Sequence, residues 1–162
     1  LDEKEISNMF LDSLKENIEK LKIKIILGPI AEKSKKALEF SKKYKKNIEF
    51  IQETKNMYKE IVNSKFGFTT GGVTTYEFAS MKVPFAVICD DKHQIPTAKE
   101  WSRKKIAINL GYINNNTPHK IEQIISSIYE KKDFKFSTNK FVDGKGAKRV
   151  SSEILKLKKN TN

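Results

Sequence analysis

Short apolar runs alternate with longer amphipathic stretches along the whole chain. The runs are strand-sized, and we expect β-strands at residues 22–27, 47–51, 66–69, 84–89 and 106–110. Between them, apolar positions recur every three or four residues, which predicts helices at residues 3–21, 30–45, 54–63, 74–81, 97–104, 117–131 and 143–158. This alternation predicts an α/β fold with a parallel sheet, right-handed crossovers and helices on both faces of the sheet.

The same pattern assigns side chains to the core. The run from Pro84 to Cys89 is apolar throughout, as expected for a strand that is covered on both faces. Asp2 and Glu5 have the spacing of a capping box at the start of the first helix. The helix at residues 30–45 is predicted from the apolar positions Ile30, Ala37, Leu38 and Tyr44. In the helix at residues 54–63, the side chains expected to point inward are Met57, Tyr58, Ile61 and Val62. We also expect Phe78 and Trp101 to be core residues rather than base-stacking platforms.

Length and composition favour one globular domain. The chain has 162 residues, of which 38% are apolar, enough for a real core. We expect one α/β domain over residues 1–158 and a polar tail over residues 159–162. No apolar run approaches the ~20 residues of a membrane span, and no secretory signal is visible. A single cysteine, Cys89, ends a predicted buried strand, which indicates a reduced core thiol and a cytoplasmic protein.

The net charge of +12 raises the question of a nucleic-acid partner. Of the 32 basic residues, 30 are lysines, and the arginines are Arg103 and Arg149. Nucleic-acid sites favour arginine and interleaved aromatic residues, whereas these lysines are scattered over helix faces. We therefore expect no nucleic-acid partner. The basic surface is better suited to steering an anionic small molecule towards a cleft.

The segment after the 66–69 strand carries the strongest candidate chemistry. Gly71 and Gly72 follow this strand, and a helix opens behind them. Glycines allow a close approach of the backbone to a ligand, and a helix N-terminus offers unpaired N–H groups to a phosphate. The hydroxyls of Thr74 and Thr75 are further donors, and Glu77 can accept hydrogen bonds from a ribose diol. This order predicts a nucleotide site at the carboxyl edge of the sheet, although each element alone also fits an ordinary strand-to-helix turn.

Few other residues are candidates for catalysis or metal binding. His93 follows the 84–89 strand, where open α/β sheets carry their sites, and it is equally compatible with substrate contact or an exposed loop position. His119 is expected to be an exposed surface residue. Asp90 and Asp91 are two adjacent acids of the kind found in turns, so we expect no metal site and no cofactor. Gly144 and Gly146 are expected to form an entry turn to the last helix.

Four segments in order resemble a known family: GGVTTYEFASMKVPFAVI (71–88), DDKHQIPTAKEW (90–101), IAINLGY (106–112) and FVDGKGAKRV (141–150). They are similar to the C-terminal half of bacterial UDP-sugar hydrolases of pseudaminic acid biosynthesis and of related spore-coat polysaccharide proteins. Both groups are GT-B glycosyltransferase-like, as is the N-acetylglucosaminyltransferase that makes lipid II. The resemblance implies a Rossmann-like domain, the C-terminal half of a GT-B fold, acting in nonulosonic acid or surface polysaccharide biosynthesis.

The resemblance also implies a ligand and site residues. UDP or a UDP-sugar would lie on Gly71, Gly72, Val73, Thr74, Thr75 and Glu77, with the base near Ile51 and Met57. In the family a polar residue and Gln are followed by Thr-Ala, which His93-Gln94 and Thr97-Ala98 match, with His93 a departure from the usual residue. Gln94 and His93 would then contact the sugar, supported by Thr97.

The resemblance further implies an upstream part of the same protein. In the family, a strand ending in a glycine-rich turn precedes the first helix, and the general base is a His of an N-terminal domain. We therefore expect the sequence to be a piece of a longer protein, and the piece alone to be inactive. Two alternatives to the hydrolase stay open: a GT-B glycosyltransferase, and a non-catalytic module appended to an acylneuraminate cytidylyltransferase.

Overall fold

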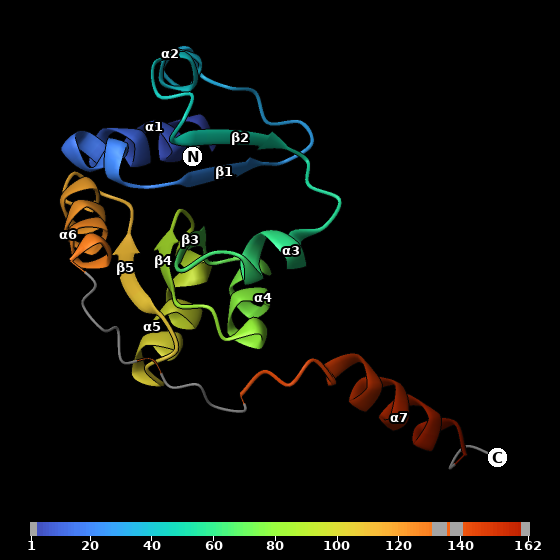
Figure 1. Cartoon of the computed structure of the whole chain (residues 1–162). Helices are drawn as coiled ribbons and strands as arrows, with labels where there is room; N and C mark the ends of the chain where they lie inside the picture. Colours follow the sequence, from blue (N-terminus) through green and yellow to red (C-terminus); the bar gives the residue numbers. More distant parts are fainter. Residues whose placement is uncertain (1–2, 131–135, 137–140, 160–162) are drawn as a thin grey trace.

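The strands form two parallel sheets, whereas a single sheet was expected (Figure 1). The computed structural model describes residues 3–130, 136 and 141–159. One sheet has the order β1-β2 and the other the order β3-β4-β5, and all pairs are parallel. The strands are β1 (Ile23–Leu27), β2 (Ile48–Gln52), β3 (Gly67–Thr70), β4 (Phe85–Cys89) and β5 (Ile108–Tyr112).

Helices cover both faces of these sheets, as predicted. The helices are α1 (Glu3–Leu14), η1 (Lys15–Lys20), α2 (Lys35–Lys43), α3 (Met57–Val62), α4 (Thr74–Met81), η2 (Lys92–Gln94), α5 (Ile95–Arg103), α6 (Thr117–Tyr129) and α7 (Gly146–Lys159). One layer holds α1, α2 and α6, and the other holds α3, α4 and α5. The α/β class with parallel strands is therefore confirmed.

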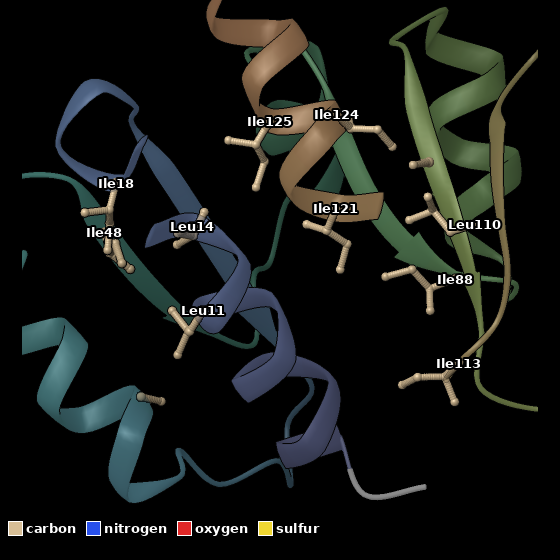
Figure 2. Close-up of a cluster of buried hydrophobic side chains, with 12 residues drawn as sticks. Leu11, Leu14, Ile18, Ile48, Ile88, Leu110, Ile113, Ile121, Ile124 and Ile125 are labelled. Atoms are coloured by element: carbon tan, nitrogen blue, oxygen red, sulfur yellow. The ribbon is translucent and has the colours of Figure 1, made fainter. Parts of the chain in front are cut away.

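The central strand β4 contributes side chains to both hydrophobic clusters. Its side chains alternate, so that Ala86 and Ile88 pack in the cluster of α1 and α6, while Phe85, Val87 and Cys89 pack against α3, α4 and α5. All five are buried, which explains the uninterrupted apolar run. Figure 2 shows the first cluster: in this view Ile121 and Ile124 of α6 lie between the leucines of α1 and Ile88 of β4, and Leu14 lies close to Ile48 of β2. Phe78 and Trp101 lie in the second cluster, as predicted.

The helix expected at residues 30–45 is shorter than predicted. It begins only after Ser34, whose hydroxyl caps α2 by accepting from the N–H of Ala37 at 3.0 Å. A turn closed by the N–H of Ala31 on the carbonyl of Gly28 at 3.2 Å, followed by residues without regular structure, takes up the preceding stretch. The prediction that the helix includes Ile30 is wrong, since α2 begins at Lys35 and Ile30 is 94% exposed; Leu38 lies on the helix but is 45% exposed.

Three other element predictions need correction. The stretch at residues 3–21 is an α-helix only to Leu14 and continues as the 3-10 helix η1. In α3, Tyr58 and Val62 are exposed, and only one of the predicted inward side chains, Ile61, is fully buried. The strand expected at residues 106–110 begins two residues later, because the N–H of Ile106 bonds the carbonyl of Trp101 and so closes the end of α5.

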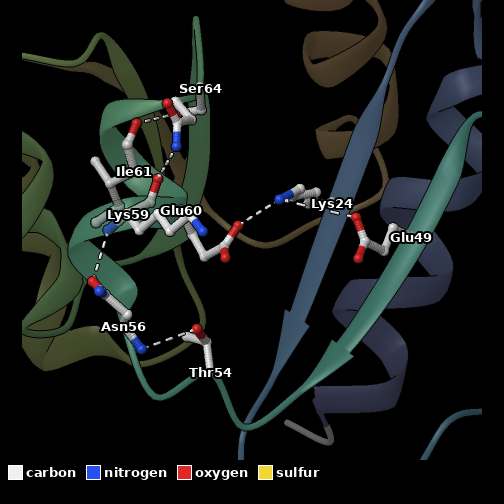
Figure 3. A network of polar contacts seen from close by, with 9 residues as sticks. Lys24, Glu49, Thr54, Asn56, Lys59, Glu60, Ile61 and Ser64 are labelled. Carbon is white, nitrogen blue, oxygen red and sulfur yellow. Dashed lines mark hydrogen bonds and ion pairs between the residues drawn. The ribbon is translucent and has the colours of Figure 1, made fainter.

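The two sheets are tied together by side chains. Lys24 of β1 pairs with Glu60 of α3 at 2.7 Å and lies 3.9 Å from Glu49 of β2 (Figure 3). On the other face, the ring of Phe10 of α1 meets that of Phe68 of β3 edge-on, with centroids 5.1 Å apart. The helix α1 thus lies across the boundary between the sheets.

The last described helix, α7, stands away from the sheets (Figure 1). Its apolar side chains Val150, Ile154 and Leu157 are 59–70% exposed. The turn before it is held by Asp143, which accepts from the N–H of Lys145 and pairs with Arg149 at 2.7 Å. None of the helices in the described part of the chain has the length and apolarity needed to cross a bilayer.

Candidate functional site

The candidate site is built on the turn between β3 and α4. Thr75 is fully buried, and its hydroxyl donates to the carbonyl of Gly72 at 2.8 Å, parallel to its own N–H bond to the same oxygen. The hydroxyl of Thr75 therefore holds the turn and does not reach the surface. Thr74 is half-buried at the first position of α4, and Val73 before it is 78% exposed.

The first glycine of the turn is packed against the neighbouring loop. The N–H of Gly71 donates to the Gln94 side-chain oxygen at 3.1 Å, and the N–H of Asp90 donates to the same oxygen at 3.2 Å. A Cβ at Gly71 would lie 2.5 Å from the Cβ of Gln94, which is closer than van der Waals contact allows. Glycine is needed here because Gln94 approaches the backbone, whereas Gly72 faces open space.

The next amides of the turn are available to a ligand. Among the described residues, no acceptor is found for the N–H groups of Gly72, Val73 and Thr74. These groups start α4, where aligned peptide dipoles give a partial positive charge. Glu77 lies one turn into the same helix, half-buried, and the described residues offer its carboxylate no hydrogen-bond or ion-pair partner. Unpaired donors and a nearby unpaired acceptor therefore share one helix end.

His93 interacts with Asp91 within the loop after β4. Its ring Nδ1 lies 2.8 Å from the Asp91 carboxylate, which also accepts from the backbone N–H of His93 at 3.0 Å. These bonds hold the pKa of Asp91 below its usual value, chiefly through the backbone N–H. The imidazole is 75% exposed, so it lies in water rather than in a closed site.

The other predicted site residues, Thr97, Met57 and Ile51, are not equally close to the turn between β3 and α4. Thr97 is half-buried on α5, one turn beyond Gln94. Met57 begins α3, which packs against α4, and its side chain lies at the edge of the second cluster. Ile51 is on β2, the outer strand of the other sheet, with β1 between it and β3. The structure therefore brings Gly71 and Gln94 into direct contact and leaves Ile51 apart from them.

Several other polar groups were singled out by sequence. His119 is an exposed helix residue, as predicted, with Glu122 and Gln123 beside it. In the described residues, no three His, Cys, Asp or Glu side chains converge as a metal site would require. Burial raises the pKa of the Cys89 thiol, which behaves as a core residue.

Two features of the site were not predicted. The bridging role of Gln94 joins residues 23 positions apart, and no local sequence pattern signals it. The carboxylate oxygen Oδ1 of Asp90 is buried without a hydrogen-bond partner in the described structure. Its position directly after the β4 strand is the kind of place where open α/β sheets carry polar site residues.

A family comparison matches nearly the whole chain. Residues 3–154 match the model of the glycosyltransferase family 28 C-terminal domain. The chain belongs to this family. The GT-B glycosyltransferase-like assignment made from the four sequence segments is therefore confirmed at this level. Neither the curated proteins nor the solved structures gave a significant match, so the family 28 domain is the relationship on which the functional argument rests.

Proposed function

We propose that this family 28 domain binds the UDP portion of a nucleotide sugar, as the C-terminal half of a UDP-sugar hydrolase. The observation that carries the proposal is the helix start after β3, where three backbone amides and the Glu77 carboxylate, one turn further on, find no partner among the described residues. The amides and the dipole of α4 would hold the diphosphate, and the Glu77 carboxylate would accept from the ribose hydroxyls. The base would lie on the side of Met57, with Ile51 further out.

In this proposal the domain assists departure of the leaving group. Cleavage of the sugar–phosphate bond leaves negative charge on UDP, and fixed amides at a helix N-terminus stabilise such charge without reorganisation. His93 and Gln94 would line the sugar side, with Thr97 behind them. The exposed His93–Asp91 pair favours a structural use of that imidazole, so we propose that the residue activating water comes from an upstream domain of the same protein.

Binding of nucleotides to the full-length protein tests the ligand. Calorimetric titration should give tighter binding of UDP than of ADP or GDP. The substitution Glu77→Ala should weaken UDP binding by about 1.5–3 kcal/mol, or about 10- to 150-fold, because a charge-assisted hydrogen bond is lost. The matched control is Glu39→Ala, which removes an exposed acid on α2 and should leave binding unchanged. Normal UDP affinity in Glu77→Ala would reduce Glu77 to a surface acid that the helix dipole favours.

A second assay separates hydrolase from transferase. UDP release from a UDP-sugar without an acceptor indicates hydrolysis, whereas release that needs an added acceptor indicates glycosyl transfer. The 162-residue chain alone should not turn over, since a single domain supplies only one wall of the catalytic cleft. Turnover by this chain that is abolished in His93→Ala would place the chemistry in this half instead. A domain that binds UDP-sugar without any turnover in the full-length protein would be an appended module.

The compartment follows from the same proposal. We place the domain in the cytoplasm, where the free buried thiol of Cys89 would stay reduced.

A further inference from the structure

The loop after β4 holds a titratable pair, Asp91 and His93, directly before the residue that joins the two loops of the candidate site. The Asp91 carboxylate accepts from the backbone N–H of His93 at 3.0 Å and lies 2.8 Å from its ring Nδ1. The next residue is Gln94, whose side-chain oxygen accepts from the N–H groups of Gly71 and Asp90. We call these last two hydrogen bonds the Gln94 bridge.

Asp91 fixes the start of the helical stretch that carries Gln94. Asp91 is itself extended, with φ −130° and ψ 148°, and its carboxylate caps η2, which continues directly into α5. The backbone carbonyl of Asp91 also accepts from the N–H of Gln94 at 3.2 Å. The carboxylate and the carbonyl thus hold one tight turn, and this turn sets the direction in which the Gln94 side chain leaves the backbone.

The Gln94 bridge has little tolerance for movement of that turn. One buried carboxamide oxygen serves two N–H groups, at 3.1 Å from Gly71 and 3.2 Å from Asp90. Both distances are at the long end of the normal range, so a shift of about 0.5 Å would break both bonds. The bridge therefore depends on the Asp91 cap, although Asp91 does not contact Gly71 through any bond found in the described residues.

The contact between Asp91 and the His93 ring changes with pH. Hydrogen bonds from His93, first of all from its backbone N–H, hold the pKa of Asp91 below its usual value, so the carboxylate is charged at neutral pH. Imidazoles commonly change charge between pH ~5 and ~8. At acid pH the ring donates to Asp91 as a cation, and charge-assisted hydrogen bonds are stronger than neutral ones.

Other charged groups lie on the same loop and on the adjoining helices. They are Asp90 and Lys92 in the loop, Lys99 and Glu100 on α5, and Glu77 on α4. Glu100 pairs with Arg103 and Lys104 instead. Among the described residues, Asp91 is the charged group that contacts the His93 ring, so the effect of ring protonation falls chiefly on the Asp91 cap.

We infer that Asp91 and His93 are positioning residues of the candidate site, and that protonation of His93 strengthens the Gln94 bridge. Because the imidazole and the carboxylate are largely exposed, the added charge should favour the bridged state by only about 2- to 5-fold. The pH response concerns the ligand-free protein and does not depend on the proposed ligand. Only the effect on nucleotide affinity rests on the proposed function.

Hydrogen exchange of the Gly71 and Asp90 amides in the ligand-free, full-length protein tests the pH response. After correction for intrinsic exchange rates, both amides should be protected about 2- to 5-fold more at pH ~5.5 than at pH ~8. The midpoint should coincide with that of the His93 ring resonances. Asp91→Asn keeps an acceptor for the backbone N–H but loses the charge, so it should abolish the pH dependence, as should His93→Gln.

The chain offers a matched control, because its other histidine is also placed beside a carboxylate. His119 lies on α6, with its Nδ1 3.8 Å from Glu122. His119→Gln should leave the pH dependence of the Gly71 and Asp90 amides unchanged. Protection that does not vary with pH in the wild-type protein, or a pH dependence that persists in His93→Gln, would overturn the inference.

Asp91→Ala tests the positioning role separately from the charge. It removes both bonds to His93, so protection of the Gly71 and Asp90 amides should fall by about 3- to 30-fold at either pH. Wild-type protection in this variant would show that Asp91 positions nothing.

UDP titration then tests the effect on binding. If the nucleotide binds the bridged state, Asp91→Ala should weaken UDP binding at pH ~8 by about 2-fold or more, and Asp91→Asn should not. Equal UDP affinity in Asp91→Ala and the wild-type protein would separate the bridge from the nucleotide site and overturn that part of the inference. Absence of UDP binding to the wild-type protein would instead refute the proposed ligand, whereas the exchange experiment would still decide the pH response.

Discussion

Gly67 provides a sharp test of how closely the second cluster is packed. A Cβ at this position would lie 2.2 Å from two ring atoms of Phe78, well inside the normal contact distance. The ring cannot easily retreat, because it stacks on the fully buried Phe85 with centroids 5.5 Å apart, and Trp101 lies behind Phe85. Gly67→Ala therefore forces overpacking in a rigid part of the core.

The expected cost follows from this overlap. Overpacking typically destabilises by ~1–3 kcal/mol, and contact with two atoms of a held ring places Gly67→Ala near the upper end. For a domain of this size, that corresponds to a fall in melting temperature of about 6–12 °C. The measurement is thermal and urea unfolding followed by circular dichroism. The matched control, Gly72→Ala, adds its Cβ to open space and should change stability by less than about 0.5 kcal/mol.

A double-mutant cycle identifies the cause. If the methyl group meets the Phe78 ring, Phe78→Leu should make room for it. The double variant should then be more stable than the sum of the two single effects by ~0.5–3 kcal/mol. Equal stability of Gly67→Ala and Gly72→Ala, or strict additivity in the cycle, would refute the packing argument.

Two further predictions concern polar groups. Gln94→Ala leaves the N–H groups of Gly71 and Asp90 without their acceptor, so the free energy of unfolding should fall by ~1–3 kcal/mol, with a smaller loss in Gln94→Glu. Equal losses in the two variants would count against the bridging role. The hydrogen bond from Arg103 lowers the pKa of Glu100 to about 2. The Glu100–Arg103 ion pair therefore stabilises the fold above pH ~4.5, and its stabilisation is lost as the pH falls towards 2. In Arg103→Gln, an NMR titration should place the Glu100 pKa nearer its ordinary value, and an unchanged pKa would contradict the assignment.

The sequence was most informative where burial is one-sided or complete. The apolar run at Pro84–Cys89 predicted β4 to within one residue, and the helix at residues 74–81 was predicted with its observed bounds. Errors occurred where local hydrogen bonds compete with periodicity. Ile30 looks helical by spacing, but the cap at Ser34 starts α2 later. Ile106 looks like the start of a strand, but its N–H closes α5 after Lys105, which has a left-handed φ of 56°.

In the candidate site, too, the sequence predicted the local features and missed those that join distant segments. The order of glycines, threonines and Glu77 predicted a turn followed by a helix N-terminus, because glycine and hydroxyl residues act on neighbouring backbone. The division of the sheet and the contact of Gln94 with Gly71 depend on segments far apart in the chain. A single sequence carries no periodic signal for either, so they required the three-dimensional structure.

One carboxamide oxygen makes the two loops of the candidate site respond together. Because the Gln94 oxygen accepts from both Gly71 and Asp90, a displacement of the turn after β3 is passed to the loop after β4. A ligand that orders the turn after β3 would also restrict the loop after β4. Binding to the second loop would then cost less conformational entropy. Recognition of a nucleotide by one loop and of its attached group by the other would then be cooperative within a single small domain.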